Sequence, residues 1–234
     1  MSDPKQEIQA LVSDIMDGRI PAEKAWQHIK GLKGKYVETY GQPSWNAYIG
    51  NRFQEIIHAM LKGYIKRLKD ETSEFTGLEV LTASEVKADP IIMRKLVVQY
   101  GDFCLLPDVD SAIVWFDFKQ PWESEIIAIA SCKTSLRERI AQACYWKLKL
   151  VSSDVQKGIR LFLATADHDD DFNLKDGIER FDGKSRDRVI SEYELDGIYI
   201  LKEDFREDWE SDKVKRFERI FRDIVKLTEN RGNL

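Results

Sequence analysis

The stretch that most constrains the fold is residues 107–150, where two strand-like segments precede a helix-like one. Residues 111–118 and 125–133 are rich in isoleucine, valine and aromatic side chains, which is typical of β-strands. Pro121 lies in the short polar segment between them and keeps that segment out of strand pairing. From Leu136 onward, apolar residues recur at helical spacing. The pattern therefore predicts a unit of strand, turn, strand and helix.

The remainder of the chain predicts further elements on both sides of this unit. Pro90 is expected to begin a helix that continues through Gln99, because proline suits a first helical turn. Two buried strands are expected after the unit, and the length of the crossover indicates parallel pairing. The other expected elements are two helices within 5–40, a long helix over 44–69 capped by Ser44, strands at 159–165 and 198–201, a short helix over 184–191 and an amphipathic closing helix over 214–227.

Together these elements predict an α/β fold with a mixed central sheet of about four or five strands, flanked by helices. A chain of 234 residues is long enough to bury a full core. We expect an N-terminal helical region over residues 1–40 and a core over residues 41–234.

The distribution of charge narrows the functional classes to which the protein can belong. The net charge of −5 argues against a general nucleic-acid coat protein, which would be basic. Residues 133–149 nevertheless contain five basic side chains and one acidic one. We expect residues 167–171 to be a solvated acidic loop, because they lack the glycine and spacing of a calcium loop.

The location expected from the sequence is the cytoplasm. No apolar run approaches the length of a membrane span, and the polar N-terminus lacks a signal-peptide core. The three scattered cysteines have no metal-binding spacing and are expected to be reduced.

Candidate catalytic residues lie at the ends of the two central strands. Side chains alternate between faces, so Ser131 and Lys133 are expected to share one face. An acidic residue opening the preceding strand would then meet the lysine; Asp108, in a Pro-Asp corner, is favoured over Asp110 and Asp117. The alternatives are a turn-stabilising aspartate and a snorkelling lysine. The pairing suits phosphodiester hydrolysis, in which a carboxylate holds Mg²⁺ and a lysine orients or deprotonates the attacking water.

With these residues identified, the stretch resembles the PD-(D/E)XK nucleases, in particular type II restriction endonucleases that cut CCGG-like or CCWGG-like sites. Pro107-Asp108 corresponds to the "PD" and Lys133 to the lysine, while residues 133–139 resemble the K-x-S-x-R-(D/E)-R recognition segment of that clade. The chain departs from the general pattern at Ser131, where Asp or Glu is usual. The resemblance implies that a helix supplies the missing carboxylate.

Glu55, on the predicted long helix, is the residue that the resemblance implies as a second metal ligand beside Asp108. The alternative from the residues alone is a solvated Glu55 that pairs with Arg52 or Lys62. Ser131 is kept as a member of the candidate catalytic site.

The resemblance also implies that residues 135–139 read DNA. Arginine donates to guanine in bidentate fashion and glutamate accepts from cytosine, so Arg137, Glu138 and Arg139 suit adjacent G·C pairs. The alternative is a capping box between Ser135 and Glu138 with ordinary exposed arginines; Glu138 as a metal ligand is a third possibility. Gln142 is a candidate for orienting water or contacting a phosphate, or is a solvated helix residue.

The resemblance implies a Mg²⁺-dependent type II restriction endonuclease that cuts double-stranded DNA at a short G·C-rich palindrome. A palindrome matches a two-fold symmetric protein, so we expect a homodimer or a higher homo-oligomer. Residues 1–40 would then serve as a dimerisation arm, as a DNA-embracing arm or simply in core packing. The alternatives are a structure-specific nuclease of repair or recombination, and a DNA-binding module with a decayed nuclease site.

Overall fold

A mixed six-stranded sheet lies at the centre of the computed structural model, which describes residues 3–136, 139–178 and 180–231. Its strand order is β1-β4-β5-β6-β7-β8. The pairs β1–β4 and β4–β5 are antiparallel, and β5 to β8 run parallel to one another. A second, two-stranded antiparallel sheet joins β2 and β3. The strands span Leu78–Thr82 (β1), Val98–Tyr100 (β2), Phe103–Leu105 (β3), Ser111–Trp115 (β4), Glu125–Lys133 (β5), Arg160–Thr165 (β6), Gly197–Ile200 (β7) and Val214–Arg216 (β8).

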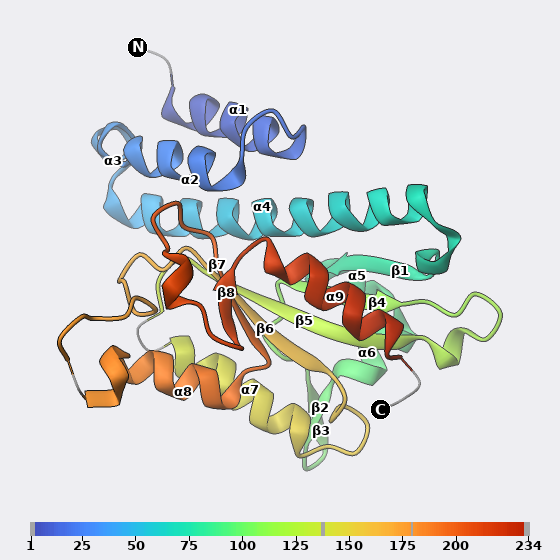
Figure 1. Ribbon diagram of the computed structural model, residues 1–234. Coiled ribbons are helices and arrows are strands. Elements are labelled where there is room, and N and C mark those ends of the chain that lie inside the picture. The colour runs from blue at the N-terminus through green and yellow to red at the C-terminus, as the bar shows by residue number, and fades with distance from the viewer. Residues whose placement is uncertain (1–2, 137–138, 179, 232–234) are drawn as a thin grey trace.

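Helices cover both faces of this sheet (Figure 1). The long helix α4 crosses one face with α1 to α3 outside it, while α7 and α8 cover the opposite face. The helices span Pro4–Met16 (α1), Ala22–Gly31 (α2), Lys33–Tyr40 (α3), Gln42–Glu71 (α4), Ala83–Ala88 (α5), Pro90–Leu96 (α6), Arg139–Val151 (α7), Arg186–Glu194 (α8) and Arg219–Glu229 (α9). No helix in the described ranges combines the length and apolar character needed to cross a membrane.

Two apolar cores, one on each face of the sheet, hold these layers together. Neighbouring β5 residues Ala128 and Ile129 belong to different cores, because strand side chains alternate between faces. In the first core, the rings of Trp26 from α2 and Phe53 from α4 have centroids 4.9 Å apart. The N-terminal helices therefore share a core with α4 and the sheet.

The predicted α/β fold and its central hairpin are confirmed. β4 and β5 are antiparallel, with Ser111 opposite Ala130, and β5 occupies the predicted residues 125–133. β4 ends at Trp115, earlier than expected, because the Asp117 side chain accepts two backbone N–H groups and starts the turn. The predicted parallel pairing of β5 with β6 is also confirmed.

Other predicted boundaries are wrong. Residues 5–40 form three helices rather than two, since the chain turns again at Leu32. The long helix α4 begins at Gln42, and Ser44 is inside it, where its hydroxyl lies 3.1 Å from the hydroxyl of Tyr36. Helix α7 is described from Arg139, and the two residues before it, where its apolar periodicity also runs, lie outside the described residues.

Four strands were missed: β1 and β8 of the main sheet, and the β2–β3 hairpin. The helix that opens at Pro90 ends at Leu96, and Val98 begins β2, whose hairpin turns at Gly101 with a positive φ of 59°. Residues 214–216, which were assigned to the closing helix, pair with β7 and make the sixth strand of the main sheet. Three residues are too few to show an alternating pattern, so the strand number was underestimated.

Candidate active site

Lys133, the last residue of β5, lies between two carboxylates. Its Nζ is 3.1 Å from Oδ2 of Asp108 and 3.5 Å from Oδ2 of Asp110. The Asp110 N–H donates to the carbonyl of Ala130, so the segment before β4 runs alongside the end of β5. The structure thus brings together the predicted residues Asp108 and Lys133 and adds Asp110, which was the competitor.

The two aspartates differ in exposure and in partners. The Asp108 side chain is 38% exposed, whereas that of Asp110 is 10% exposed. Oδ2 of Asp110 accepts the Cys132 N–H at 2.6 Å, and Oδ1 accepts Nε2 of Gln54 at 2.7 Å. Burial raises the pKa of Asp110, and the opposing influences of Lys133 and the Cys132 N–H do not reverse this. Asp108 is therefore the carboxylate that is open to an incoming ligand.

Helix α4 contributes two polar residues that the sequence analysis did not select. Gln54 donates to Asp110, and one turn later Nδ1 of His58 lies 3.0 Å from Oγ of Ser111. Burial is the main cause that lowers the pKa of His58, so its ring is neutral at pH 7. Gln54 and His58 are four residues apart and therefore share one face of α4. This spacing, next to the apolar stripe of the helix, could have identified both residues in the sequence.

Glu55 does not contact Asp108 or Lys133, contrary to what the resemblance implied. Its side chain is 48% exposed, and Oε1 lies 2.6 Å from Nη2 of Arg52. Successive residues of an α-helix are rotated by about 100°, so Gln54 and Glu55 face different directions. The structure places Glu55 in the ion pair that was the alternative expectation, and the α4 residue that reaches the site is Gln54.

Ser131 lies two residues before Lys133 and therefore on the same face of β5. It is buried, 4% exposed, opposite Leu163 of β6. A hydroxyl cannot supply the negative charge of the usual acid at this position. The carboxylates that contact Lys133 in the described residues are consequently those of Asp108 and Asp110.

The candidate DNA-binding segment is described only in part. Arg137 and Glu138 lie outside the described residues. Arg139 is the first residue of α7 and is exposed, Ser135 is half-buried just before it, and Gln142 is exposed in the first turn of α7. The described members of the segment thus lie next to Lys133 in the chain.

A cleft of about 750 Å³ adjoins this segment, with Thr134, Ser135 and Arg139 in its lining. Asp167 also lines it but is only 1% exposed, so the prediction of a fully solvated acidic loop is wrong at this residue. Its carboxylate accepts two backbone N–H groups of its own loop, and burial raises its pKa to about 6. The remaining charged and polar lining residues are Lys30, Lys33, Asn46, His168, Asp169, Asp170, Lys202 and Asp204.

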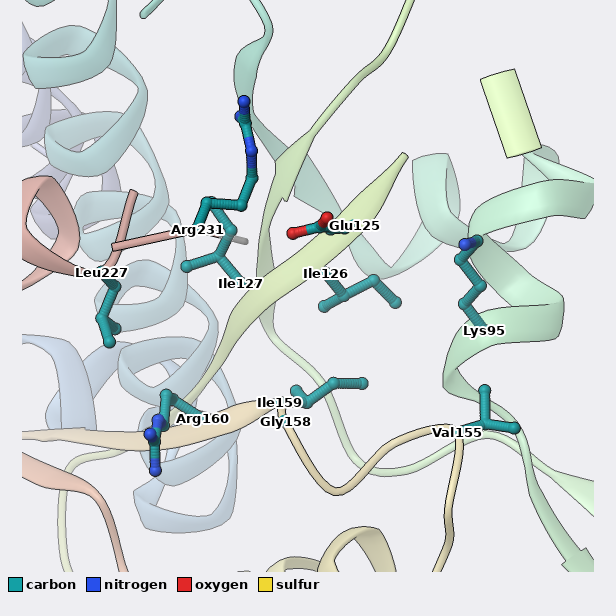
Figure 2. Close-up of a pocket in the computed structure, with 10 residues that line it drawn as sticks. All are labelled: Lys95, Glu125, Ile126, Ile127, Val155, Gly158, Ile159, Arg160, Leu227 and Arg231. Atoms are coloured by element: carbon teal, nitrogen blue, oxygen red, sulfur yellow. The ribbon is translucent and has the colours of Figure 1, made fainter. Parts of the chain in front are cut away.

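A smaller cavity of about 250 Å³ lies at the other end of the sheet (Figure 2). It is lined by the first residues of β5, including Glu125, and by Lys95, Arg160 and Arg231. β5 spans nine residues from Glu125 to Lys133, and at about 3.3 Å per residue the two ends of such a strand are roughly 26 Å apart. This cavity is therefore separate from the candidate active site.

The donor set at Lys133 suits Mg²⁺. Within the described residues, no three His, Cys, Asp or Glu side chains converge as a complete metal cluster. Mg²⁺, however, is usually held by one or two carboxylates and completes its octahedron with water and substrate phosphates. The half-exposed Asp108 carboxylate meets that requirement, whereas the oxygens of Asp110 already accept hydrogen bonds.

Comparisons with known proteins agree with this geometry. Residues 85–223 match the family model "BsaWI restriction endonuclease type 2". MjaVIP of Methanocaldococcus jannaschii, designated a type II restriction enzyme, is 39% identical over 188 residues, which are 80% of this chain and 77% of that protein. HpyAORF263P of Helicobacter pylori, with a similar designation, is 33% identical over 129 residues, 55% of this chain and 63% of that protein.

A solved structure, restriction endonuclease PspGI in complex with substrate DNA, has a similar fold. Its TM-score is 0.51 and its sequence identity 14%, over 98% of this chain and 94% of that chain. The family match extends from α5 to α9 and includes Asp108, Lys133 and the segment between them. The chain belongs to the BsaWI family of type II restriction endonucleases.

Proposed function

We propose that this protein is a Mg²⁺-dependent endonuclease that hydrolyses double-stranded DNA at a short G·C-rich palindrome, CCGG-like or CCWGG-like. The observation that carries the proposal is the 3.1 Å contact between Lys133 and Asp108 at the ends of adjacent strands. The family supports a nuclease, and the PspGI structure, which contains substrate DNA, supports a DNA partner. We place the reaction in the cytoplasm, in keeping with three cysteines that form no disulfide.

In this proposal Asp108 holds the metal and Lys133 acts on the water. A bound Mg²⁺ supplies charge neutralisation at the scissile phosphate. The Lys133 ammonium donates hydrogen bonds and has no acceptor, so it can orient the lone pair of an attacking water or offset phosphate charge. Its side chain is 8% exposed and held by carboxylates, which restricts the positions that its Nζ can take.

We assign base reading to residues 137–139, of which Arg139 begins the described part of α7. Arg137, Glu138 and Arg139 would contact G·C pairs in the major groove, where arginine to guanine and glutamate to cytosine are good pairings. Ser135 and Gln142, which flank them, would contact the DNA backbone. The support is the position of Arg139, exposed at the start of a helix that follows the Lys133 strand directly.

We also propose that the active form is a homodimer. One chain offers one Asp108–Lys133 site, and cutting both strands of a palindrome requires two sites related by a two-fold axis. Light scattering in solution should therefore give a mass near twice the 27.2 kDa of the chain, or a larger even multiple.

The testing experiment compares wild type with Lys133→Ala on unmethylated phage DNA, with and without Mg²⁺. Wild type should give discrete fragments only with Mg²⁺, and sequencing of their ends should show a G·C-rich palindrome. Lys133→Ala should fold but not cut, whereas the control Lys157→Ala, at an exposed lysine paired with Asp154, should cut normally. Full activity of Lys133→Ala would refute the assignment.

Two other outcomes would identify the alternatives. Cleavage of flaps or junctions without a fixed fragment pattern would indicate a structure-specific nuclease of repair or recombination. Specific binding without cleavage in Mg²⁺ or Mn²⁺ would indicate a binding module, and Ser131, in place of the usual acid, would be the first residue to examine.

A further inference from the structure

The Asp110 carboxylate is occupied by protein donors on both oxygens. Oδ1 accepts from Gln54 of α4 at 2.7 Å, and Oδ2 accepts the Cys132 N–H at 2.6 Å and lies 3.5 Å from Nζ of Lys133. A carboxylate offers about four lone-pair positions. Three of those on Asp110 therefore face donors from two different elements of the fold.

The neighbouring Asp108 carboxylate is arranged differently. Its side chain is 38% exposed, compared with 10% for Asp110, and the contact that the structure gives it is with Lys133. A metal that approached Asp110 would have to displace buried hydrogen bonds and leave their donors unpaired, which is unfavourable. No such displacement is needed at Asp108.

We infer that Asp110 and Gln54 form a positioning pair, which holds the end of β5 and Lys133 for catalysis, and that Asp110 is not a metal ligand. This inference rests on the proposed function, since it divides the roles of the two aspartates in that reaction. The pair connects α4 to the segment that leads into β4. One turn further along α4, His58 contacts Ser111, the residue that follows Asp110.

The geometry explains how the pair acts through Lys133. Oδ2 of Asp110 binds the backbone N–H of Cys132, the residue just before Lys133, and also faces the Lys133 ammonium. The Gln54 amide fixes the rotation of the Asp110 carboxylate through its other oxygen. Loss of the Gln54 contact should consequently shift Lys133 relative to Asp108 without changing the surface that binds DNA.

The test is a double-mutant exchange of donor and acceptor. Gln54→Glu places two carboxylates against each other and should lower kcat by roughly 10- to 100-fold, with KM for DNA unchanged, because small misplacements in active sites have costs of this size. Asp110→Asn should keep most activity, since its amide can accept from Cys132 and donate to a rotated Gln54 amide. Gln54→Glu with Asp110→Asn reverses the hydrogen bond and should recover most of the lost kcat.

Two controls distinguish a loss of positioning from a loss of folding and from a general effect of added negative charge. Gln42→Glu makes the same change on the same helix, where Gln42 is exposed and bonds Asn46, and should leave kcat unchanged. Thermal unfolding checks that each variant is folded. If Gln54→Glu does not fold, Gln54→Met removes the donor without adding charge and should also lower kcat at constant KM.

The results that would overturn the inference differ from those that would overturn the proposed function. If Asp110→Asn loses activity as completely as Asp108→Asn and requires at least about tenfold more Mg²⁺, Asp110 is a ligand of the metal. If the double variant is no better than the worse single variant, or if Gln42→Glu loses as much activity, the contact does not position Lys133. A wild-type protein that fails to cut DNA overturns the proposed function itself.

Discussion

The ammonium of Lys133 lies 3.1 Å from a carboxylate oxygen of Asp108, although the two residues are 25 positions apart in the chain. The antiparallel pairing of β4 and β5 makes this contact possible, because it places the start of one strand beside the end of the next. A partly exposed carboxylate and a buried lysine are thereby held together at one end of the central strands.

Removal of the Asp108 charge should abolish cleavage without preventing DNA binding. Asp108→Asn keeps the size of the side chain but loses the negative charge that suits Mg²⁺. We expect at least a roughly 100-fold lower single-turnover rate in Mg²⁺, and equal or tighter DNA binding in its absence, because one repulsive charge is gone. Quench-flow kinetics and fluorescence anisotropy measure the two effects. Normal cleavage would exclude Asp108 as the metal ligand.

Replacement of Glu55 distinguishes the observed geometry from the role that the resemblance implied. Its carboxylate is half-exposed and paired with Arg52, and an exposed ion pair of this kind contributes about 1 kcal/mol or less. Glu55→Gln should leave the cleavage rate and the Mg²⁺ concentration for half-maximal activity within about twofold of wild type. A rate loss that added Mg²⁺ partly restores would instead show that Glu55 enters the site once metal and DNA are bound.

Asp167 should make stability depend on pH in an unusual direction for a carboxylate. Its pKa is raised to about 6 by burial, so between its unfolded value near 3.8 and pH 6 the native state binds more protons than the unfolded state. The contribution of Asp167 to the free energy of unfolding is fully present below about pH 3.8 and is lost as pH rises through 6. The loss is about 3 kcal/mol.

Asp167→Asn removes that titration. Urea unfolding of wild type and variant at several pH values isolates the effect, because other titrating groups cancel in the difference. The free energy of unfolding of the variant, relative to wild type, should increase by about 2.4 kcal/mol between pH 4 and pH 7. A difference that stays constant over this range would show that Asp167 titrates normally.

The buried pair of Lys147 and Asp196 should matter for stability rather than catalysis. Lys147 Nζ lies 2.6 Å from Asp196 Oδ2 and also donates to the carbonyl of Ile159 at 3.2 Å. Lys147→Met leaves the Asp196 carboxylate with Arg160 as its remaining ion-pair partner at 3.2 Å. We expect a loss of about 3 kcal/mol in the free energy of unfolding and an unchanged cleavage rate at low temperature. A selective loss of activity would place this pair in the functional machinery.

The sequence by itself determined the elements whose pattern is local. The seven residues of β5 from Ile126 to Cys132 are all apolar or small, and this run predicts a buried strand without any knowledge of its partners. The turn after β4 follows from Pro121 and the parallel crossover to β6 from chain length in the same way, although the Asp117 contacts that end β4 were not predicted. Lys133 could be selected because it ends such a strand, and Asp108 because its Pro-Asp corner precedes the neighbouring strand.

Only the tertiary structure decided which side chains surround them. Gln54 and Glu55 are adjacent in the sequence, but the docking angle of α4 on the sheet turns the first toward Asp110 and leaves the second with Arg52. Burial separates Asp110 from Asp108 in the same way, since it depends on packing between elements that are far apart in the chain. Local patterns specify the strands and helices, whereas the partners of each carboxylate depend on how those elements pack.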